Sequence, residues 1–174
     1  MHWKKGLAVL FLATVSSVAE EFRFESVGAR FGFSVNHRTH DLHQADAVAA
    51  WNLPWAGEPV SQWRLQTRLE FTAGVVFAPG PDAFITTVGP TLSLGRVTFP
   101  LSLELGVSPS MLSRREIGRT DFGSLFQFTS HAGLNWDLGV RFRVGYRLQH
   151  MSNSGLAGHN PGLNLHVLSA SYRF

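Results

Sequence analysis

In the segment from residue 140 to 152, V-R-F-R-V-G-Y-R-L-Q-H-M-S, apolar side chains occupy alternate positions as far as Leu148, with arginines and a glycine between them. Alternation with a period of two is typical of a β-strand, because successive side chains point to opposite faces. One face of this strand is apolar, and the other carries Arg141, Arg143 and Arg147. His150 and Ser152 continue the apolar face. The sequence therefore places a possible base and nucleophile on a surface that otherwise suits hydrocarbon.

The same alternation recurs along the chain and predicts eight strands in all. We expect them at about residues 29–35, 44–53, 63–77, 84–94, 97–107, 126–136, 140–152 and 168–174, the last of these extending back past Asn164. Arg23 and Glu25 break the parity of the first strand. Beyond the N-terminal region, no apolar run is long enough for a membrane-spanning helix, which needs about 20 residues.

The N-terminus has the three parts of a secretory signal peptide. Lys4 and Lys5 precede an apolar run over residues 6–15, and Ser17-Val18-Ala19 forms a small-x-small cleavage site. We expect residues 1–19 to be a signal peptide and residues 20–174 to form a single domain. The chain has no cysteine, which excludes disulfide bonds and a lipoprotein anchor.

The positive charge of the chain is concentrated in that signal segment. Lys4 and Lys5 are the only lysines, and they supply most of the formal net charge of +3. The remaining arginines and carboxylates are nearly balanced. Nucleic acid is therefore not an expected partner, despite the basic isoelectric point.

Strands of ten or more residues, apolar on one face and charged on the other, predict an all-β, eight-stranded antiparallel transmembrane β-barrel of the bacterial outer membrane. A soluble lipocalin-like barrel would place its apolar face inside and its polar face outside. The aromatic residues favour the membrane alternative, because they fall near one rim as an interfacial girdle does. These residues are Trp55, Trp63, Trp136, Tyr172 and Phe174.

Loop lengths orient the predicted barrel. Both termini share one rim with a tight connection at residues 135–138, whereas residues 108–124 form a long loop at the other end. Short periplasmic turns and long outer loops are the usual asymmetry, so the termini are expected to be periplasmic. Inside the barrel, we expect arginines to pair with Glu70 and Glu104. The candidate arginines are Arg64, Arg68, Arg141, Arg143 and Arg147.

The direction of each strand then determines at which end of the barrel the polar residues on the apolar face lie. The seventh strand runs outward, so His150 and Ser152 lie at the level of the external head groups. The glycine-rich connection 153–162 follows, and the eighth strand returns with Asn164 and His166 on the same face. His166 could contact the phosphate or sugar of a substrate, or serve as an interfacial residue.

These residues resemble a known family. His150-Met151-Ser152-Asn153, Gly155-Leu156 and the segment 160–164, N-P-G-L-N, are similar to the outer-membrane lipid A 3-O-deacylases, the PagL family. The resemblance implies an eight-stranded barrel that cleaves the ester at position 3 of lipid A with a Ser, a His and an acidic residue.

Residue by residue, the resemblance assigns the catalytic base to His150 and the nucleophile to Ser152. It implies an oxyanion role for Asn160, and the backbone N–H of Gly155 and the neighbouring Asn153 are further candidates. The position of the acidic residue falls on Asn164. A neutral Asn can orient a catalytic histidine, but it lacks the charge that stabilises an imidazolium, so we expect a slower enzyme.

No cofactor or metal is expected. His37, His40 and His43 lie in an outer loop and lack a fourth ligand for zinc. The expected partners are lipid A, or lipopolysaccharide, and outer-membrane lipids; the sequence leaves a homodimer open. Two alternatives remain at this point: a non-catalytic structural or adhesive barrel, and an outer-membrane phospholipase.

Overall fold

The computed structural model describes residues 22–34, 41–55, 57–60 and 62–174. The expected signal peptide, residues 1–19, lies outside this part of the chain, as do His37 and His40. Among the described residues, no helix is long and apolar enough to cross a membrane.

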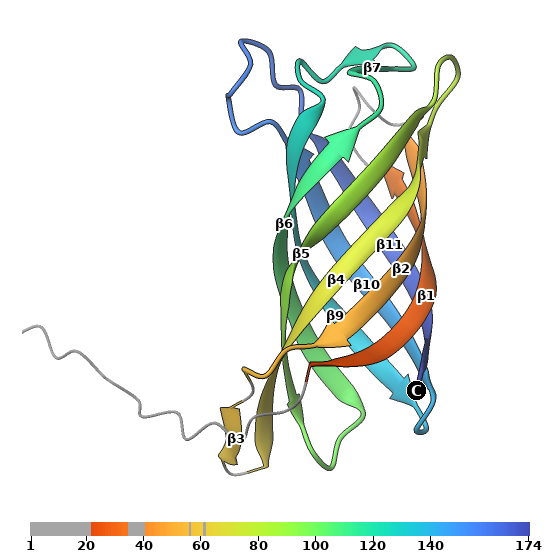
Figure 1. The fold of residues 1–174 in the computed structure, drawn as a ribbon. Coiled ribbons are helices and arrows are strands. Elements are labelled where there is room, and N and C mark those ends of the chain that lie inside the picture. The colour runs from red at the N-terminus through yellow and green to blue at the C-terminus, as the bar shows by residue number, and fades with distance from the viewer. Residues whose placement is uncertain (1–21, 35–40, 56, 61) are drawn as a thin grey trace, which may run out of the picture.

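Eight long strands form one closed antiparallel barrel (Figure 1). Each long strand pairs with its neighbours along the chain, and the pairing of the first with the last closes the ring. The strands are β1 (Arg23–Ser34), β2 (His43–Asn52), β4 (Trp63–Phe77), β5 (Ala83–Arg96), β6 (Leu101–Leu112), β9 (Phe126–Leu138), β10 (Phe142–Ser152) and β11 (Leu163–Arg173). The predicted fold class is confirmed.

Three short strands complete the fold. β3 (Gly57–Val60) pairs with the start of β4, and β7 (Glu116–Ile117) pairs with β8 (Thr120–Asp121) in the connection between β6 and β9. Figure 1 shows β3 at the end of the barrel where the C-terminus lies and β7 at the opposite end. We call the first end the terminal rim and the second the loop end.

Two connections differ from the prediction. The tight connection lies at residues 139–141 rather than 135–138, because Gly139 adopts a left-handed conformation (φ 71°) that glycine tolerates and other residues disfavour. The long loop begins after Leu112 rather than at residue 108. β6 continues that far because the Ser110 hydroxyl points into the barrel and bonds Thr129 Oγ1 at 2.7 Å.

The broken parity of the first strand has a structural cause. The β1–β2 register shifts between Phe24 and Ser26, which pair with consecutive residues, Trp51 and Ala50. This β-bulge lets Glu25 and Ser26 both face the interior although they are adjacent in sequence, and both are buried. Glu25 thereby joins the charged network inside the barrel.

The middle of the barrel is filled by buried ion pairs. Arg68 contacts Glu104 at 2.7 Å and Glu25 at 3.5 Å, while Arg30 contacts Glu70 at 2.7 Å. Asn135 also donates to Glu104, at 2.7 Å. Because each carboxylate has more than one partner, the buried charges compensate one another.

The expected arginine partners are confirmed only in part. Arg68 and Arg147 do reach Glu70 or Glu104, although the contacts of Arg147 are long, at 3.7 and 3.9 Å. Arg143 instead pairs with Asp137 at 2.6 Å and with Glu25 at 3.4 Å. The other two expected residues are exposed: Arg141 bonds the Tyr172 hydroxyl at 2.9 Å, and Arg64 lies at the terminal rim.

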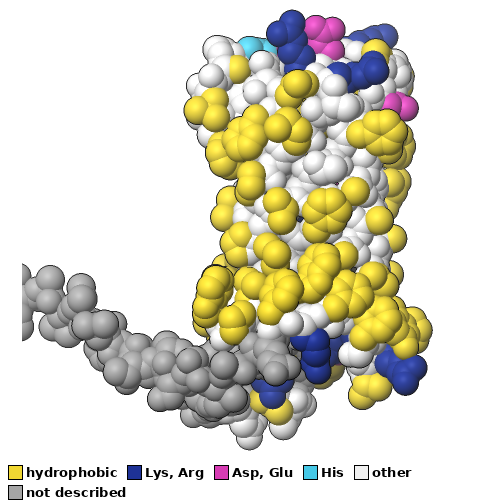
Figure 2. Space-filling view, viewed as in Figure 1, with side chains coloured by type: hydrophobic (Ala, Val, Ile, Leu, Met, Phe, Trp, Pro, Cys, Tyr) yellow, Lys and Arg dark blue, Asp and Glu magenta, His cyan; other side chains and the backbone are white. Residues whose placement is uncertain are grey.

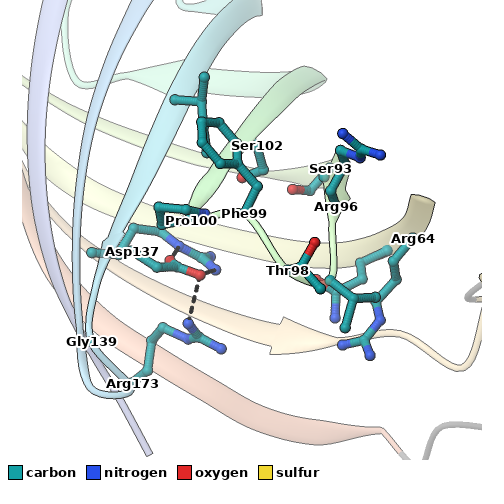
Figure 3. A pocket seen from close by; sticks show the side chains of 15 residues that line it. Arg64, Ser93, Arg96, Thr98, Phe99, Pro100, Ser102, Asp137, Gly139 and Arg173 are labelled. Carbon is teal, nitrogen blue, oxygen red and sulfur yellow. Dashed lines mark hydrogen bonds and ion pairs between the residues drawn. The ribbon is translucent and has the colours of Figure 1, made fainter. Parts of the chain in front are cut away.

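The lumen opens at the terminal rim into a cavity of about 480 Å³. Figure 3 shows Asp137 and Arg173 on its wall, joined by a hydrogen bond of 3.0 Å. Asp137 therefore pairs with two arginines at this mouth, since it also binds Arg143. This cavity is at the opposite end of β10 from His150.

At the loop end, the interior is apolar rather than charged. Inward side chains of β10 and β11, including Met151 and Leu163, pack with Ile117 and Phe122 from the long loop, and all are almost completely buried. The loop connection thus closes this end of the barrel with a hydrophobic cluster. The expected charged network is confined to the middle and the terminal rim, whereas at the loop end the buried polar side chains Gln127 and Asn153 accompany the apolar cluster.

The outer wall is apolar. Figure 2 shows hydrophobic side chains over the middle of the barrel, with charged side chains at both ends. The predicted aromatic girdle includes packed rings: Phe142 and Tyr172 lie 5.5 Å apart, and Phe99 and Trp136 lie 6.1 Å apart. The exposed apolar wall is what a bilayer requires.

Replacing Arg68 by Met should destabilise the barrel by about 3–5 kcal/mol, because Glu104 and Glu25 would lose a buried partner. Urea unfolding of the protein in detergent micelles measures this change. Arg64→Met is the matched control, on the same strand and face but exposed, and should change stability little. Equal stability of the two variants would contradict a structural role for the network.

Candidate functional site

His150 and Asn164 meet on the outer surface near the loop end. They are directly opposed in the β10–β11 register, and both follow the lipid-facing parity of their strands. His150 Nδ1 lies 2.6 Å from Asn164 Oδ1. An amide oxygen only accepts hydrogen bonds, so Nδ1 carries the proton and Nε2 presents its lone pair. The ring is thereby oriented with a basic nitrogen available.

Ser152 continues the same face of β10, opposite Phe128 of β9, and is partly buried. Within the described part of the chain, no hydrogen bond joins its hydroxyl to His150. Side chains two positions apart on one strand face start about 6.6 Å apart, so contact depends on their rotamers. Hydrogen bonds of this kind often tighten only when substrate binds.

The loop after β10 is anchored by Asn153. Its side chain is completely buried and donates to the carbonyl oxygens of Phe122 at 2.9 Å and His159 at 2.7 Å. Its Oδ1 accepts the N–H of Gly155 at 2.9 Å. Asn153 therefore ties the loop that follows Ser152 to the long loop between β6 and β9.

Asn160, near the end of this loop, is hydrogen-bonded to Asn153 at its start. Its Oδ1 accepts the backbone N–H of Asn153 at 3.2 Å, and the residue is exposed. The predicted oxyanion candidates are thus brought together, but the N–H of Gly155 and the side-chain NH2 of Asn153 already donate within the loop. The NH2 group of Asn160 remains the donor best suited to a ligand.

Gly162 lies next to His150, a contact that the sequence did not reveal. A Cβ at this position would lie 3.2 Å from His150 Cε1, and the backbone is left-handed (φ 65°). Glycine therefore meets two requirements here, space for the imidazole and a conformation that other residues disfavour. The Asn-Pro-Gly sequence signals only a turn, so the contact with His150 depends on the fold.

A shallow groove of about 380 Å³ lies beside the His150–Asn164 pair. It crosses β9, β10 and β11 on the outer wall, and small side chains on β9 provide its floor. Its lining residues are Ser130, His131, Ala132, Leu148, Gln149, His150, Asn164 and Leu165. A groove of this kind, open to lipid and adjacent to a basic nitrogen, suits a hydrocarbon chain.

Fold and site together define a class: an eight-stranded outer-membrane barrel with a polar site on its lipid-facing surface. The family model described as lipid A 3-O-deacylase (PagL) matches residues 25–173. The chain therefore belongs to the PagL family, and it is a protein of the bacterial outer membrane.

Relatives support the same assignment. Lipid A deacylase PagL of Bordetella bronchiseptica is 36% identical over 72 residues, which are 41% of this chain and 40% of that protein. The matched segment thus spans less than half of the relative. The crystal structure of the outer membrane enzyme PagL superposes with a TM-score of 0.72 at 20% identity, covering 84% of this chain and 97% of that one.

More distant structures share the fold alone. A structure from the de novo design of transmembrane β-barrels has a TM-score of 0.51 at 13% identity, covering 90% of this chain and 99% of that one. Because a designed barrel also superposes, the architecture by itself does not specify the site.

Gly162→Ala should turn the His150 ring and destabilise the fold by about 1 kcal/mol, since alanine disfavours a positive φ. NMR of the protein with labelled histidine in micelles should show shifted His150 ring signals. Gly158→Ala is the matched control, because a Cβ at residue 158 would meet nothing within 4 Å. Unshifted His150 signals in Gly162→Ala would show that the contact does not position the ring.

Proposed function

We propose that this protein is a lipid A 3-O-deacylase that hydrolyses the ester-linked acyl chain at position 3 by a serine mechanism. The observation that carries the proposal is the 2.6 Å hydrogen bond between His150 and Asn164 on the lipid-facing surface. This hydrogen bond leaves His150 Nε2 free to act as a base, at the depth where the head groups and acyl chains of the outer leaflet meet.

Ser152 Oγ would attack the ester carbonyl carbon while His150 Nε2 takes the hydroxyl proton. The tetrahedral intermediate then collapses, and His150 returns the proton to the departing sugar oxygen. Water repeats the sequence on the acyl-enzyme and releases the fatty acid. Asn164 holds the ring through both halves but supplies no negative charge.

The oxyanion is stabilised by donors from the loop that follows Ser152. The amide NH2 of Asn160 is the leading candidate, because its Oδ1 is already fixed by the N–H of Asn153. The groove over Ala132 and Leu148 takes the acyl chain. Substrate thus approaches laterally from the membrane, with its sugar at the exposed loop.

Ser152→Ala should abolish deacylation, because no nucleophile remains to form the acyl-enzyme. Mass spectrometry of lipid A from expressing cells would show loss of one 3-hydroxyacyl chain with the wild type only. Ser154→Gly, an exposed neighbour with positive φ (54°), should retain activity. Unchanged lipid A with a folded wild-type barrel would instead favour a non-catalytic barrel or a phospholipase, and released phospholipid products would identify the latter.

Asn164→Asp should raise the deacylation rate by at least about tenfold, because a carboxylate of the same shape stabilises the imidazolium formed during attack. Asn164→Leu should lower the rate, since it removes the acceptor at Nδ1. Steady-state kinetics on purified lipid A in micelles compares the two. A slower Asp variant would show that Asn164 does not occupy the position of the acidic residue.

A further inference from the structure

Tyr146 and His166 form a second polar pair on the lipid-facing wall. His166 is opposite Leu148 in the β10–β11 register, two residues closer to the middle of the barrel than Asn164. The Tyr146 hydroxyl is hydrogen-bonded to His166 Nδ1 across the two strands. The pair is therefore a neighbour of the candidate active site but separate from it.

The surroundings of this pair are apolar. Leu134 and Leu168, the register partners of Tyr146, are 47% and 54% exposed on the outer wall. Phe33 of β1 stacks on His166 with ring centroids 5.5 Å apart and an interplanar angle of 11°. Polar groups in contact with hydrocarbon are costly, so a fixed polar pair here calls for a ligand.

The pair has one hydrogen-bond donor more than its mutual hydrogen bond uses. A phenol and a neutral imidazole carry one O–H and one N–H between them. Their mutual hydrogen bond uses one of these and leaves the other, whichever group is the donor. The pair therefore presents a single hydrogen-bond donor to the membrane, which suits an acceptor such as a carbonyl oxygen.

The depth of the pair in the leaflet restricts which carbonyl oxygen can accept this hydrogen bond. Two residues along a strand correspond to about 6.6 Å. Along β11, His166 lies two residues below Asn164, and along β10, Tyr146 lies four residues below His150. With a strand tilt of about 40°, the His166 backbone is about 5 Å deeper in the leaflet than Asn164, and the Tyr146 backbone is about 10 Å deeper than His150. Their hydrogen bond lies between these two depths. The ester cleaved at Ser152 is too shallow to reach it. In lipid A, the ester carbonyl of a secondary acyl chain lies a few carbon atoms below the primary ones.

We propose that Tyr146 and His166 form a subsite that donates a hydrogen bond to a carbonyl oxygen of an acyl chain other than the one cleaved. The proposal rests on the proposed deacylase function. The ester of a secondary acyl chain fits the depth best. Phospholipids have no such ester, so the subsite would favour lipid A over the phospholipids of the same membrane.

The test is the double variant Tyr146→Phe/His166→Phe, which removes the donor and retains aromatic rings against Phe33. Its control is Tyr172→Phe, which makes the same tyrosine-to-phenylalanine change on the lipid-facing wall but near the terminal rim, far from the proposed subsite. Purified proteins in micelles are assayed on hexa-acylated lipid A and on tetra-acylated lipid A that lacks secondary chains. Gel mobility before and after heating confirms that each barrel is folded.

Because one hydrogen bond is lost, we expect kcat/KM of the double variant on hexa-acylated lipid A to fall five- to tenfold, mainly through KM. The tetra-acylated substrate and Tyr172→Phe should be unaffected. Equal losses on both substrates would overturn the assignment to a secondary acyl chain. Unchanged kinetics on both substrates would overturn the subsite. A folded but inactive wild type would refute the deacylase function itself, and the subsite with it.

Discussion

Pairing of β1 with β11 closes the sheet, and the rest of the structure depends on this closure. Hydrocarbon offers no partner for an unpaired backbone N–H or C=O, so a spanning sheet must have no free edge. Once the ring is closed, alternate side chains are committed to lipid or lumen. His150 and Asn164 then have to lie on the outside, although both are polar.

The lumen shows how the barrel tolerates charge at its centre. Arg68 and Arg30 are held by carboxylates from other strands, and the bulge at Glu25 supplies one of them. Each of these contacts links two strands that are separated by one other strand in the ring. The apolar cluster at the loop end has a different role, because it joins the long loop to β10 and β11 next to the site. Rigid strands and a packed loop together restrict the positions of the catalytic candidates.

The site itself is assembled from two strands and the loop that connects them. Register opposes His150 to Asn164, Gly162 leaves space for the imidazole, and Asn153 anchors the loop to the carbonyl oxygens of Phe122 and His159. The Tyr146–His166 pair extends this arrangement deeper along the same strands. A substrate spread over this wall would therefore meet polar groups at two depths, which is how a flat membrane surface can distinguish between lipids.

Alternation in the sequence determined the barrel, the lipid-facing side of most long strands and the position of His150, Ser152 and Asn164 on that side, because side-chain direction in a strand is a local property. Contacts between distant segments could not be obtained in this way. The bulge at Glu25, the Arg143–Asp137 pair, the apolar closure around Phe122 and the contact of Gly162 with His150 all depend on register and loop packing. Tertiary structure decided these, because they join residues that only the closed ring and its folded loops bring within bonding distance.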